Sequence, residues 1–293
     1  MSPQVSPPRP SANCVRLVMI GDIVGKPGLR VTCSAIPWLR RELQADVIVA
    51  NAENAADGSG LRCKDYRRLI ESGVDGITLG DHVYKKREII EILESSPNII
   101  RPANLPAQAP GKTVMVLSLR SGLQVAIMCV LGRVFMKPVD CPFQAVDKLL
   151  TSLDESHPNV RMRVIDFHAE ATSDKQVMGR YVDGRVSAVL GTHTHVVTAD
   201  EQILPGGTAF QCDIGMTGPF KSILGRDIGS VLEATLHGVP VPFPVATEDV
   251  RMYGTWLDLD PVSGTCQAIG RIVLEQQMLL EYDSACQDQR RVL

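Results

Sequence analysis

The sequence lacks an apolar run long enough to cross a membrane. A membrane helix needs about 18–20 consecutive apolar residues, and no stretch of the chain reaches that length. The segment before Val15 is polar and rich in proline and serine, without the apolar core of a signal peptide. We therefore expect a disordered tail at 1–14, no membrane association and a cytoplasmic location.

A surplus of basic residues is also missing. The chain holds 30 lysines and arginines against 33 aspartates and glutamates, a formal net charge of −3 at pH 7. Proteins that bind long nucleic acids usually carry a basic surplus, so duplex DNA is not an expected partner. A mononucleotide or a short oligonucleotide remains open as a ligand.

Several catalytic and metal-binding motifs are absent. No two of the eight cysteines have the C-x-x-C spacing of a zinc ribbon or redox motif, and their scatter argues against a disulfide framework. The glycine-rich stretch at 21–28, GDIVGKPG, lacks the Gly-Lys-Ser/Thr ending of a phosphate-binding P-loop. No serine has the spacing of a nucleophile elbow. Nucleophilic serine catalysis and P-loop chemistry are therefore not expected.

Apolar runs of strand type alternate with helical patterns along most of the chain. The predicted strands are 15–20, 46–50, 74–79, 164–167, 186–190 and 208–212. The predicted helices are 31–43, 64–72, 85–94, 143–153 and one after His168 that is capped by Thr172 or Ser173. Two hairpins are predicted, at 113–131 and 253–274. This alternation indicates one mixed α/β domain at 15–275, with a largely parallel sheet and antiparallel additions. The polar segment 276–293 is expected to be peripheral.

Polar side chains follow five of the predicted strands. They are Asp22, Glu53 with Asn54, Asp81 with His82, His168, and His193 with His195. Ligand sites in open α/β sheets form outside the carboxyl ends of strands, so these residues can converge at one edge. Imidazole and carboxylate are ligands of first-row transition metals. The set exceeds what one ion needs and fits two ions about 3.5–4 Å apart, the geometry that acts on phosphate esters.

Each residue alone has an ordinary structural alternative. Asp22 could cap the following helix, Glu53 could be a solvated loop acid, and His168 could be a satisfied, half-buried histidine. His193 and His195 give the strongest local signal, because alternate residues of an extended segment point to the same side. Four of the six histidines fall at strand ends, whereas His157 and His237 are expected at the surface.

Long motifs carry a resemblance to a known family. They include ANAENAADGSGL at 50–61, GVDGITLGDHVYKKREI at 73–89, DFHAEATSDK at 166–175 and DGRVSAVLGTHTHVVTADEQILPGGTAF at 183–210. From about Arg16 to Ile272 the chain resembles the YmdB-like family of bacterial calcineurin-like metallophosphoesterases. The resemblance implies an α/β sandwich of two mixed sheets flanked by helices, a di-metal centre and a homo-oligomer. It also implies phosphodiesterase activity on cyclic nucleotides, 2′,3′-cAMP and/or 3′,5′-cAMP.

The same resemblance implies a role for each site residue. The ligands of one metal fall on Asp22, Glu53, Asn54 and His195, and those of the other on Glu53, Asp81, His168 and His193, with Glu53 as the bridge. The proton donor falls on His82. The chain departs from the family at Asp81, where the family usually has asparagine. A carboxylate there adds negative charge, which should weaken the Lewis acidity of the centre and repel an anionic substrate.

The expected function is a di-metal phosphodiesterase, with iron or manganese as the expected ions. A metal-activated hydroxide would attack phosphorus and His82 would protonate the leaving oxygen. The alternatives are a metal-binding regulator that binds a nucleotide or protein with weak or no catalysis, and a di-metal peptidase or amidohydrolase. Asp213 to Pro219, DIGMTGP, also matches the family, and the sequence gives this loop no physical role.

Overall fold

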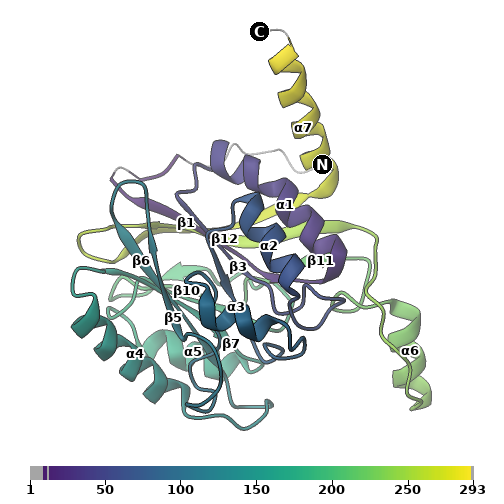
Figure 1. Ribbon diagram of the computed structural model, residues 1–293, viewed down its shortest axis with the longest axis horizontal. Helices are drawn as coiled ribbons and strands as arrows, with labels where there is room; N and C mark the ends of the chain where they lie inside the picture. The colour runs from purple at the N-terminus through teal and green to yellow at the C-terminus, as the bar shows by residue number, and fades with distance from the viewer. Residues whose placement is uncertain (1–8, 12, 292–293) are drawn as a thin grey trace.

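The computed structural model describes residues 9–11 and 13–291. Two mixed β-sheets stack face to face, and helices cover their outer faces (Figure 1). The sandwich predicted for this chain is therefore confirmed. Of the predicted tail, residues 1–8 and 12 lie outside the described residues, while Ser11 donates hydrogen bonds to the Asp258 carboxylate from its backbone N–H and its hydroxyl.

The first sheet has seven strands in the order β2-β11-β12-β1-β3-β4, with β13 paired to β12. Their bounds are β1 (Val15–Ile20), β2 (Asp22–Ile23), β3 (Val47–Asn51), β4 (Gly76–Thr78), β11 (Met216–Pro219), β12 (Val250–Leu259) and β13 (Cys266–Glu275). Strands β1, β3 and β4 run parallel, and β12 is antiparallel to β1. The parallel strands bring the segments after β3 and β4 to the same edge.

The second sheet has six strands in the order β5-β6-β7-β8-β10-β9. Their bounds are β5 (Val114–Ser118), β6 (Gln124–Leu131), β7 (Met162–His168), β8 (Ala188–Thr192), β9 (Gln202–Ile203) and β10 (Ala209–Gln211). Strands β6, β7, β8 and β10 run parallel, whereas β5 forms the predicted hairpin with β6. The carboxyl ends of β7 and β8 therefore lie side by side.

Strand alternation divides the core into three layers. In β1, Val18 and Ile20 pack towards the helices, while Leu17 and Met19 pack between the sheets. This follows from the two-residue period of a strand, which sends successive side chains to opposite faces. Because both faces of the central strands are covered, their sequences read as continuous apolar runs. The third layer lies between the second sheet and its helices, around Phe167.

Helices cover both outer faces of the sandwich. The helices of the described residues are α1 (Gly25–Arg41), α2 (Cys63–Ser72), α3 (Ile89–Ser95), α4 (Pro142–Ser156), α5 (Thr172–Tyr181), α6 (Ile228–His237) and α7 (Gln276–Arg291), of which α6 and α7 project from the body. Gly73 ends α2 in the left-handed conformation with φ 106°, as its glycine predicts. Among the described residues, no helix is both long and apolar enough to span a membrane.

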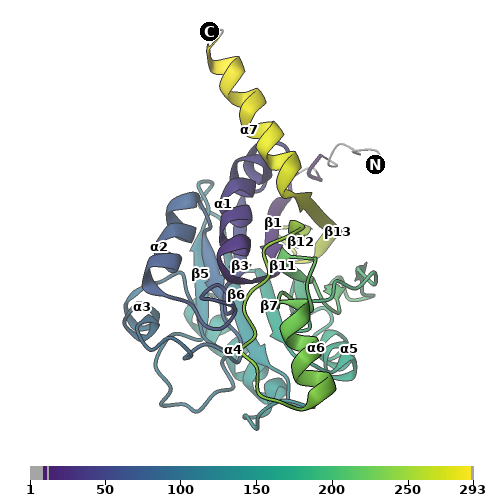
Figure 2. The same ribbon diagram turned by 90° about the vertical axis from the view of Figure 1, so that its right-hand side faces the viewer.

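Two helices were not predicted. The segment 276–293 was expected to be a peripheral tail, and its residues up to Arg291 form α7, which buries Leu279 near its start and then extends away from the body (Figure 1). Helix α6 stands off the sandwich (Figure 1), on the side that faces the viewer in Figure 2, and has no buried residue. Because α6 contributes no residue to the core, the alternation of core strands and helices did not predict it.

Candidate metal centre

The strand ends bring all the predicted site residues to one edge of the sandwich. Asp22 starts β2, while Glu53 and Asn54 follow β3, and Asp81 and His82 follow β4. From the second sheet, His168 is the last residue of β7, and His193 and His195 follow β8. The site therefore lies where the two sheets meet. No single sheet could bring these side chains together.

Four of these side chains gather most tightly. Glu53, Asp81, His168 and His193 each offer a ligand atom, and these atoms all lie within 4.8 Å of one another. His168 Nε2 lies 3.3 Å from Glu53 Oε1 and 3.3 Å from Asp81 Oδ1. His193 Nδ1 lies 3.6 Å from the same Asp81 oxygen. This group of four could hold a metal ion.

Hydrogen bonding fixes which nitrogen of His168 is free. Thr192 Oγ1 donates its proton to Asp166 Oδ1 at 2.6 Å, so it can only accept from His168 Nδ1, 2.8 Å away. The Nδ1–H is therefore occupied, and the Nε2 lone pair points at the two carboxylates. A partner that holds the second ring nitrogen in this way is typical of metal-binding histidines.

His193 is oriented by a residue that the sequence did not single out. Its Nε2 lies 3.2 Å from Glu170 Oε2, a carboxylate that favours a proton on Nε2 and so leaves Nδ1 towards the site. His193 Nδ1 then faces His168 Nε2 at 3.0 Å. Two nitrogen lone pairs at that distance repel unless a cation lies with them. The arrangement therefore fits a shared positive charge, which the sequence assigns to a metal.

Asn54 and His195 form the second part of the site. His195 Nδ1 donates to the backbone oxygen of Leu224 at 3.1 Å, so its Nε2 is the free nitrogen and lies 3.1 Å from Asn54 Nδ2. Asn54 Nδ2 in turn lies 3.1 Å from Glu53 Oε1. Glu53 thus contacts both groups, His168 on one side and Asn54 on the other, which is the position a bridging carboxylate needs.

Asp22 supplies a further test of metal fit. Its side chain is fully buried, and Oδ2 accepts a hydrogen bond from the backbone N–H of His193 at 3.1 Å. In the described part of the chain, Asp22 Oδ1 is one of two buried side-chain oxygens without a hydrogen-bond partner. A buried oxygen that lacks a donor costs about 1–3 kcal/mol. A cation bound beside Asp22 would satisfy this oxygen.

Burial and charge shift the site's pKa values in opposite directions. Burial raises the pKa of Asp22 well above its usual value. Burial also raises the pKa of Asp81, but the hydrogen bond and charge of His168 outweigh it, and the net pKa of Asp81 is lowered. Burial lowers the pKa of His168, but the nearby carboxylates, Glu53 foremost, raise it by more. The net pKa of His168 is therefore well above its usual range. The carboxylates therefore favour positive charge at His168 Nε2.

His82 stands at the mouth of the site. Its side chain is 29% exposed, and its Nδ1 lies 2.8 Å from Asn54 Oδ1, to which it donates. The backbone N–H of His82 donates to Glu53 Oε2 at 2.9 Å. The remaining ring nitrogen, Nε2, lies 3.9 Å from Asp81 Oδ2. His82 is thus held by its backbone and one nitrogen, with the other nitrogen free to exchange a proton.

The segment with His193 and His195 differs from its prediction. Strand β8 ends at Thr192, and His193 and His195 have φ values of 95° and 65°, so the segment is not extended. The interpretation that the two imidazoles reach one locus by strand alternation was wrong. Left-handed backbone at non-glycine residues is strained and persists where the surroundings impose it. Here the bends send His193 to His168 and His195 to Asn54.

A buried carboxylate holds that bent segment in place. Asp213 Oδ2 accepts hydrogen bonds from the backbone N–H and the hydroxyl of Thr194, at 3.1 and 2.7 Å. Its Oδ1 accepts from the backbone N–H of Gly215 at 2.8 Å, and Lys175 Nζ donates to Oδ2 at 2.7 Å. The DIGMTGP loop therefore has a structural role that the sequence did not reveal.

Asp166 connects the two sheets directly beneath the site. Besides Thr192 of β8, its carboxylate accepts from Thr78 Oγ1 at 2.5 Å and from Asn51 Nδ2 at 3.0 Å, both in the first sheet. All these side chains are fully buried. Asp166 lies two residues before His168 on β7, so both face the same side. That spacing is the signal that could have identified it.

Close backbone approach explains one glycine beside the site. A Cβ on Gly80 would lie 2.3 Å from both Glu53 Oε2 and His168 Nε2. No larger residue fits there without displacing both side chains. The predicted surface histidines, His157 and His237, are exposed and lie outside the site.

Comparisons with known proteins agree with this geometry. A model of the family described as YmdB-like protein matches residues 18–272. The chain is 42% identical over 260 residues to the 2′,3′-cyclic-nucleotide 2′-phosphodiesterase of Bacillus subtilis (strain 168), covering 89% of this chain and 97% of that protein. A solved structure of a hypothetical protein from Thermus thermophilus has a TM-score of 0.83 at 41% identity, covering 89% of this chain and 99% of that one. A phosphatase from Mycoplasma pneumoniae also gives 0.83, at 29% identity, covering 90% and 94% of the two chains.

Proposed function

Because this chain belongs to the family of YmdB-like proteins, we propose that it is a metal-dependent phosphodiesterase that hydrolyses cyclic nucleotides, 2′,3′-cAMP and/or 3′,5′-cAMP. One observation carries the proposal. His168 Nε2 and His193 Nδ1, the ring nitrogens that face away from Thr192 and Glu170, lie 3.0 Å apart beside the carboxylates of Glu53 and Asp81. Separate backbone segments from both sheets hold those atoms, which supports a built cation site and not a chance surface cluster.

Two ions would be held by the residues already described. Asp22, Glu53, Asn54 and His195 would hold one, and Glu53, Asp81, His168 and His193 the other. When bound, such a pair lowers the pKa of water to near neutrality and neutralises phosphate oxygens. Iron and manganese are the proposed metals, because a mixed set of imidazoles and carboxylates suits both.

His82 would act as the acid of the reaction. Its Nδ1–H is directed to Asn54 Oδ1, so the proton available for transfer would be on Nε2. A protonated Nε2 would donate to the sugar oxygen as the phosphorus–oxygen bond breaks, so that the leaving group departs as a neutral hydroxyl. Acids placed in this way accelerate such steps by about 10²–10⁴-fold.

The remaining polar residues would position the ligands. Asp166 through Thr192 would keep the His168 proton on Nδ1, and Glu170 would keep the His193 proton on Nε2. Each leaves the opposite nitrogen free towards the centre. Partners of this kind orient ligands and raise their basicity, and their loss typically costs about 10–100-fold in affinity or activity.

The test combines metal counting with a substrate panel. The purified protein is analysed for bound metals and assayed with bis-p-nitrophenyl phosphate, 2′,3′-cAMP, 3′,5′-cAMP and a peptide. Hydrolysis of a cyclic nucleotide by protein with about two ions per chain supports the proposal. Two bound ions without hydrolysis of any phosphodiester would instead indicate a metal-binding regulator, and peptide hydrolysis alone would indicate a peptidase.

We also propose that the protein is a homo-oligomer. On α6, Ile228, Leu232 and Leu236 recur at helical spacing and are 38%, 45% and 72% exposed. Helix α6 stands away from the sandwich (Figure 1). Contiguous exposed apolar residues of this kind are typical of protein interfaces. A second copy of the chain is the partner proposed for this face.

A further inference from the structure

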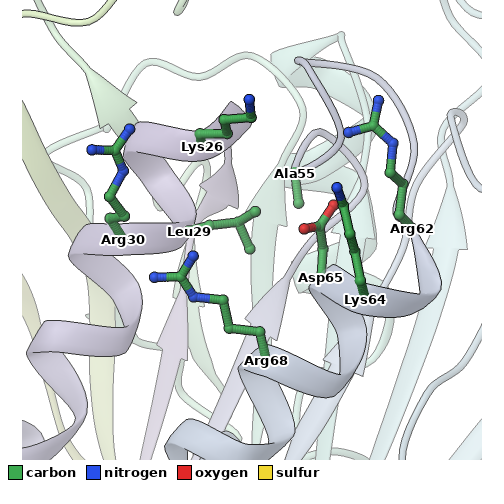
Figure 3. A pocket seen from close by; sticks show the side chains of 8 residues that line it. All are labelled: Lys26, Leu29, Arg30, Ala55, Arg62, Lys64, Asp65 and Arg68. Atoms are coloured by element: carbon green, nitrogen blue, oxygen red, sulfur yellow. The ribbon is translucent and has the colours of Figure 1, made fainter.

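A basic pocket lies between α1 and α2 (Figure 3). It encloses about 310 Å³. Five cations line it, together with the single acid Asp65. They are Lys26 and Arg30 from α1, Arg62 directly before α2, and Lys64 and Arg68 from α2. Arg68 reaches from α2 towards α1 across the opening (Figure 3). In a chain of net charge −3, this concentration of positive charge is local.

Most of these cations form no salt bridge in the part of the chain that the structure describes. Within the described ranges, no hydrogen bond or ion pair joins the side chain of Lys26, Arg30, Lys64 or Arg68 to another residue. Arg62 is the exception, since it pairs with Asp57. Two carboxylates lie beside the cations, Asp65 in the lining and Asp57 paired with Arg62. The five cations outnumber them, so the pocket carries a net positive charge that an anion would neutralise.

The pocket and the metal centre share a backbone segment. Helix α1 begins at Gly25, just after Asp22, and the Gly25 N–H donates to the backbone oxygen of Asn54 at 2.9 Å. Ala55, the next residue, lines the pocket. Both helices start after strands whose carboxyl ends carry site residues, so the pocket opens on the same edge of the fold as the metal centre.

The size and charge of the pocket suit a phosphate with its sugar. A volume of 310 Å³ corresponds to roughly ten water molecules, each taking about 30 Å³ in the liquid. Arginine and lysine bind phosphate oxygens through short, charge-assisted hydrogen bonds. A cyclic mononucleotide has one phosphate, which the metal centre would occupy. A second phosphate site is of use only for a longer substrate.

We infer that this basic pocket binds a backbone phosphate of a short oligoribonucleotide whose terminal 2′,3′-cyclic phosphate lies at the metal centre. The inference rests on the proposed function, because it extends the substrate from the free cyclic nucleotide to an RNA end. Long duplexes remain unfavourable, since the protein as a whole carries a net charge of −3. The net charge of the chain did not exclude a mononucleotide or a short oligonucleotide as a ligand. The proposal favours the short oligonucleotide.

Paired kinetics test the proposal. The values of kcat/KM are measured for 2′,3′-cAMP and for a tetraribonucleotide ending in 2′,3′-cyclic adenylate, using the unchanged protein, Arg30→Glu and Arg68→Glu. The unchanged protein should prefer the tetranucleotide. Each charge reversal should lower kcat/KM for the tetranucleotide by about tenfold or more, the effect of losing one charged hydrogen bond. Turnover of 2′,3′-cAMP should stay within about twofold, because neither arginine lies in the metal centre.

Matched reversals on the opposite side of the molecule serve as controls. Lys148→Glu on α4 and Arg180→Glu on α5 change the net charge equally, and both side chains are exposed. These control variants should keep the preference of the unchanged protein for the tetranucleotide over 2′,3′-cAMP. Equal turnover of both substrates by the unchanged protein, or a preference that survives the pocket reversals, would overturn the pocket proposal and leave the proposed function standing.

A binding measurement separates the two proposals if no turnover occurs. Fluorescence anisotropy of a labelled tetraribonucleotide with a 3′-phosphate reports binding without chemistry. Weaker binding to Arg30→Glu and Arg68→Glu than to the control reversals would support the pocket even if the proposed function failed. Equal affinity of the tetraribonucleotide for the pocket variants and the control variants would refute the pocket proposal. Binding to the unchanged protein should also weaken with salt, with a slope of about −0.7 per phosphate contacted.

Discussion

Lys175 Nζ lies 2.7 Å from Asp213 Oδ2, and both side chains are 1% exposed. The same Asp213 oxygen holds Thr194, which lies between His193 and His195. Two proposed ligands are therefore positioned by an ion pair between α5 and the DIGMTGP loop. The charges are buried together, and removal of one would leave the other without compensation.

The first prediction concerns this ion pair. Lys175→Met should lower the free energy of unfolding by about 3–5 kcal/mol, because an uncompensated carboxylate remains buried. It should also reduce metal content, since Thr194 loses its fixed acceptor. Urea unfolding and elemental analysis measure the two effects. Lys148→Met, at an exposed position of α4, is the control and should change neither. An unchanged unfolding free energy in Lys175→Met would contradict the role of the pair.

The second prediction concerns Glu53 as the bridge. Its carboxylate contacts both His168 and Asn54, so Glu53→Gln should reduce the binding of both ions together. Metal content measured by elemental analysis should fall towards zero, with circular dichroism confirming that the fold is kept. Glu233→Gln, on the exposed face of α6, is the control and should retain both ions. Loss of one ion alone would argue against a bridging position.

The third prediction concerns His82 as the acid. His82→Ala should lower kcat by about 10²–10⁴-fold on a cyclic nucleotide while the metal content stays unchanged. The metal should stay bound because His82 is not one of the proposed ligands. It only contacts two of them, Asn54 and Glu53, and its side chain is 29% exposed. His157→Ala, at an exposed position, should keep full activity. A metal-loaded His82→Ala protein with full activity would rule out the acid role.

The fourth prediction concerns Asp81, where the family usually has asparagine. Asp81→Asn removes one negative charge from a side chain that lies 3.3 Å from His168 Nε2 and 3.6 Å from His193 Nδ1. The amide oxygen can still bind a metal, so metal content should be kept. The rate on an anionic cyclic nucleotide should rise, because the centre becomes a stronger Lewis acid. An unchanged or lower kcat would count against this charge argument.

The fifth prediction concerns the face of α6. Leu232→Asp should convert an oligomer to a chain of 31.9 kDa, since a buried charge would disfavour the interface. Light scattering after size-exclusion chromatography measures the mass. Val177→Asp on α5, where the valine is 54% exposed, is the control and should leave the oligomer intact. A monomeric mass for the unchanged protein would refute the oligomer itself.

Much of the fold could be predicted from local patterns. The apolar runs VRLVMI and MRVIDFH are strands because they are buried on both faces, and the hairpin at 113–131 was confirmed as β5 and β6. Elements without a core-facing pattern were missed. Helix α6 buries no residue, and β2, β9 and β11 are too short to show a period. Hydrophobic periodicity detects an element only where the element contributes to the core.

The sequence by itself determined the chemistry of the site. Asp22, Glu53, Asn54, Asp81, His168, His193 and His195 fall at strand ends, and parallel strands bring their carboxyl ends to one edge. The chemical types of those side chains favour a metal site, and the family resemblance adds His82 as the proposed acid. Neither prediction needed coordinates, because residue type, position relative to the strands and the resemblance are all read from the sequence.

Only the tertiary structure decided how the site is held. Asp166 meets Thr78 across 88 positions of sequence, and Lys175 meets Asp213 across 38. The left-handed backbone of His193 and His195 is imposed by such contacts, and no local pattern encodes it. The basic pocket between α1 and α2 likewise exists only because the two helices pack side by side. Hydrogen bonds and charge pairs between distant segments depend on the three-dimensional arrangement, so sequence spacing alone could not reveal them.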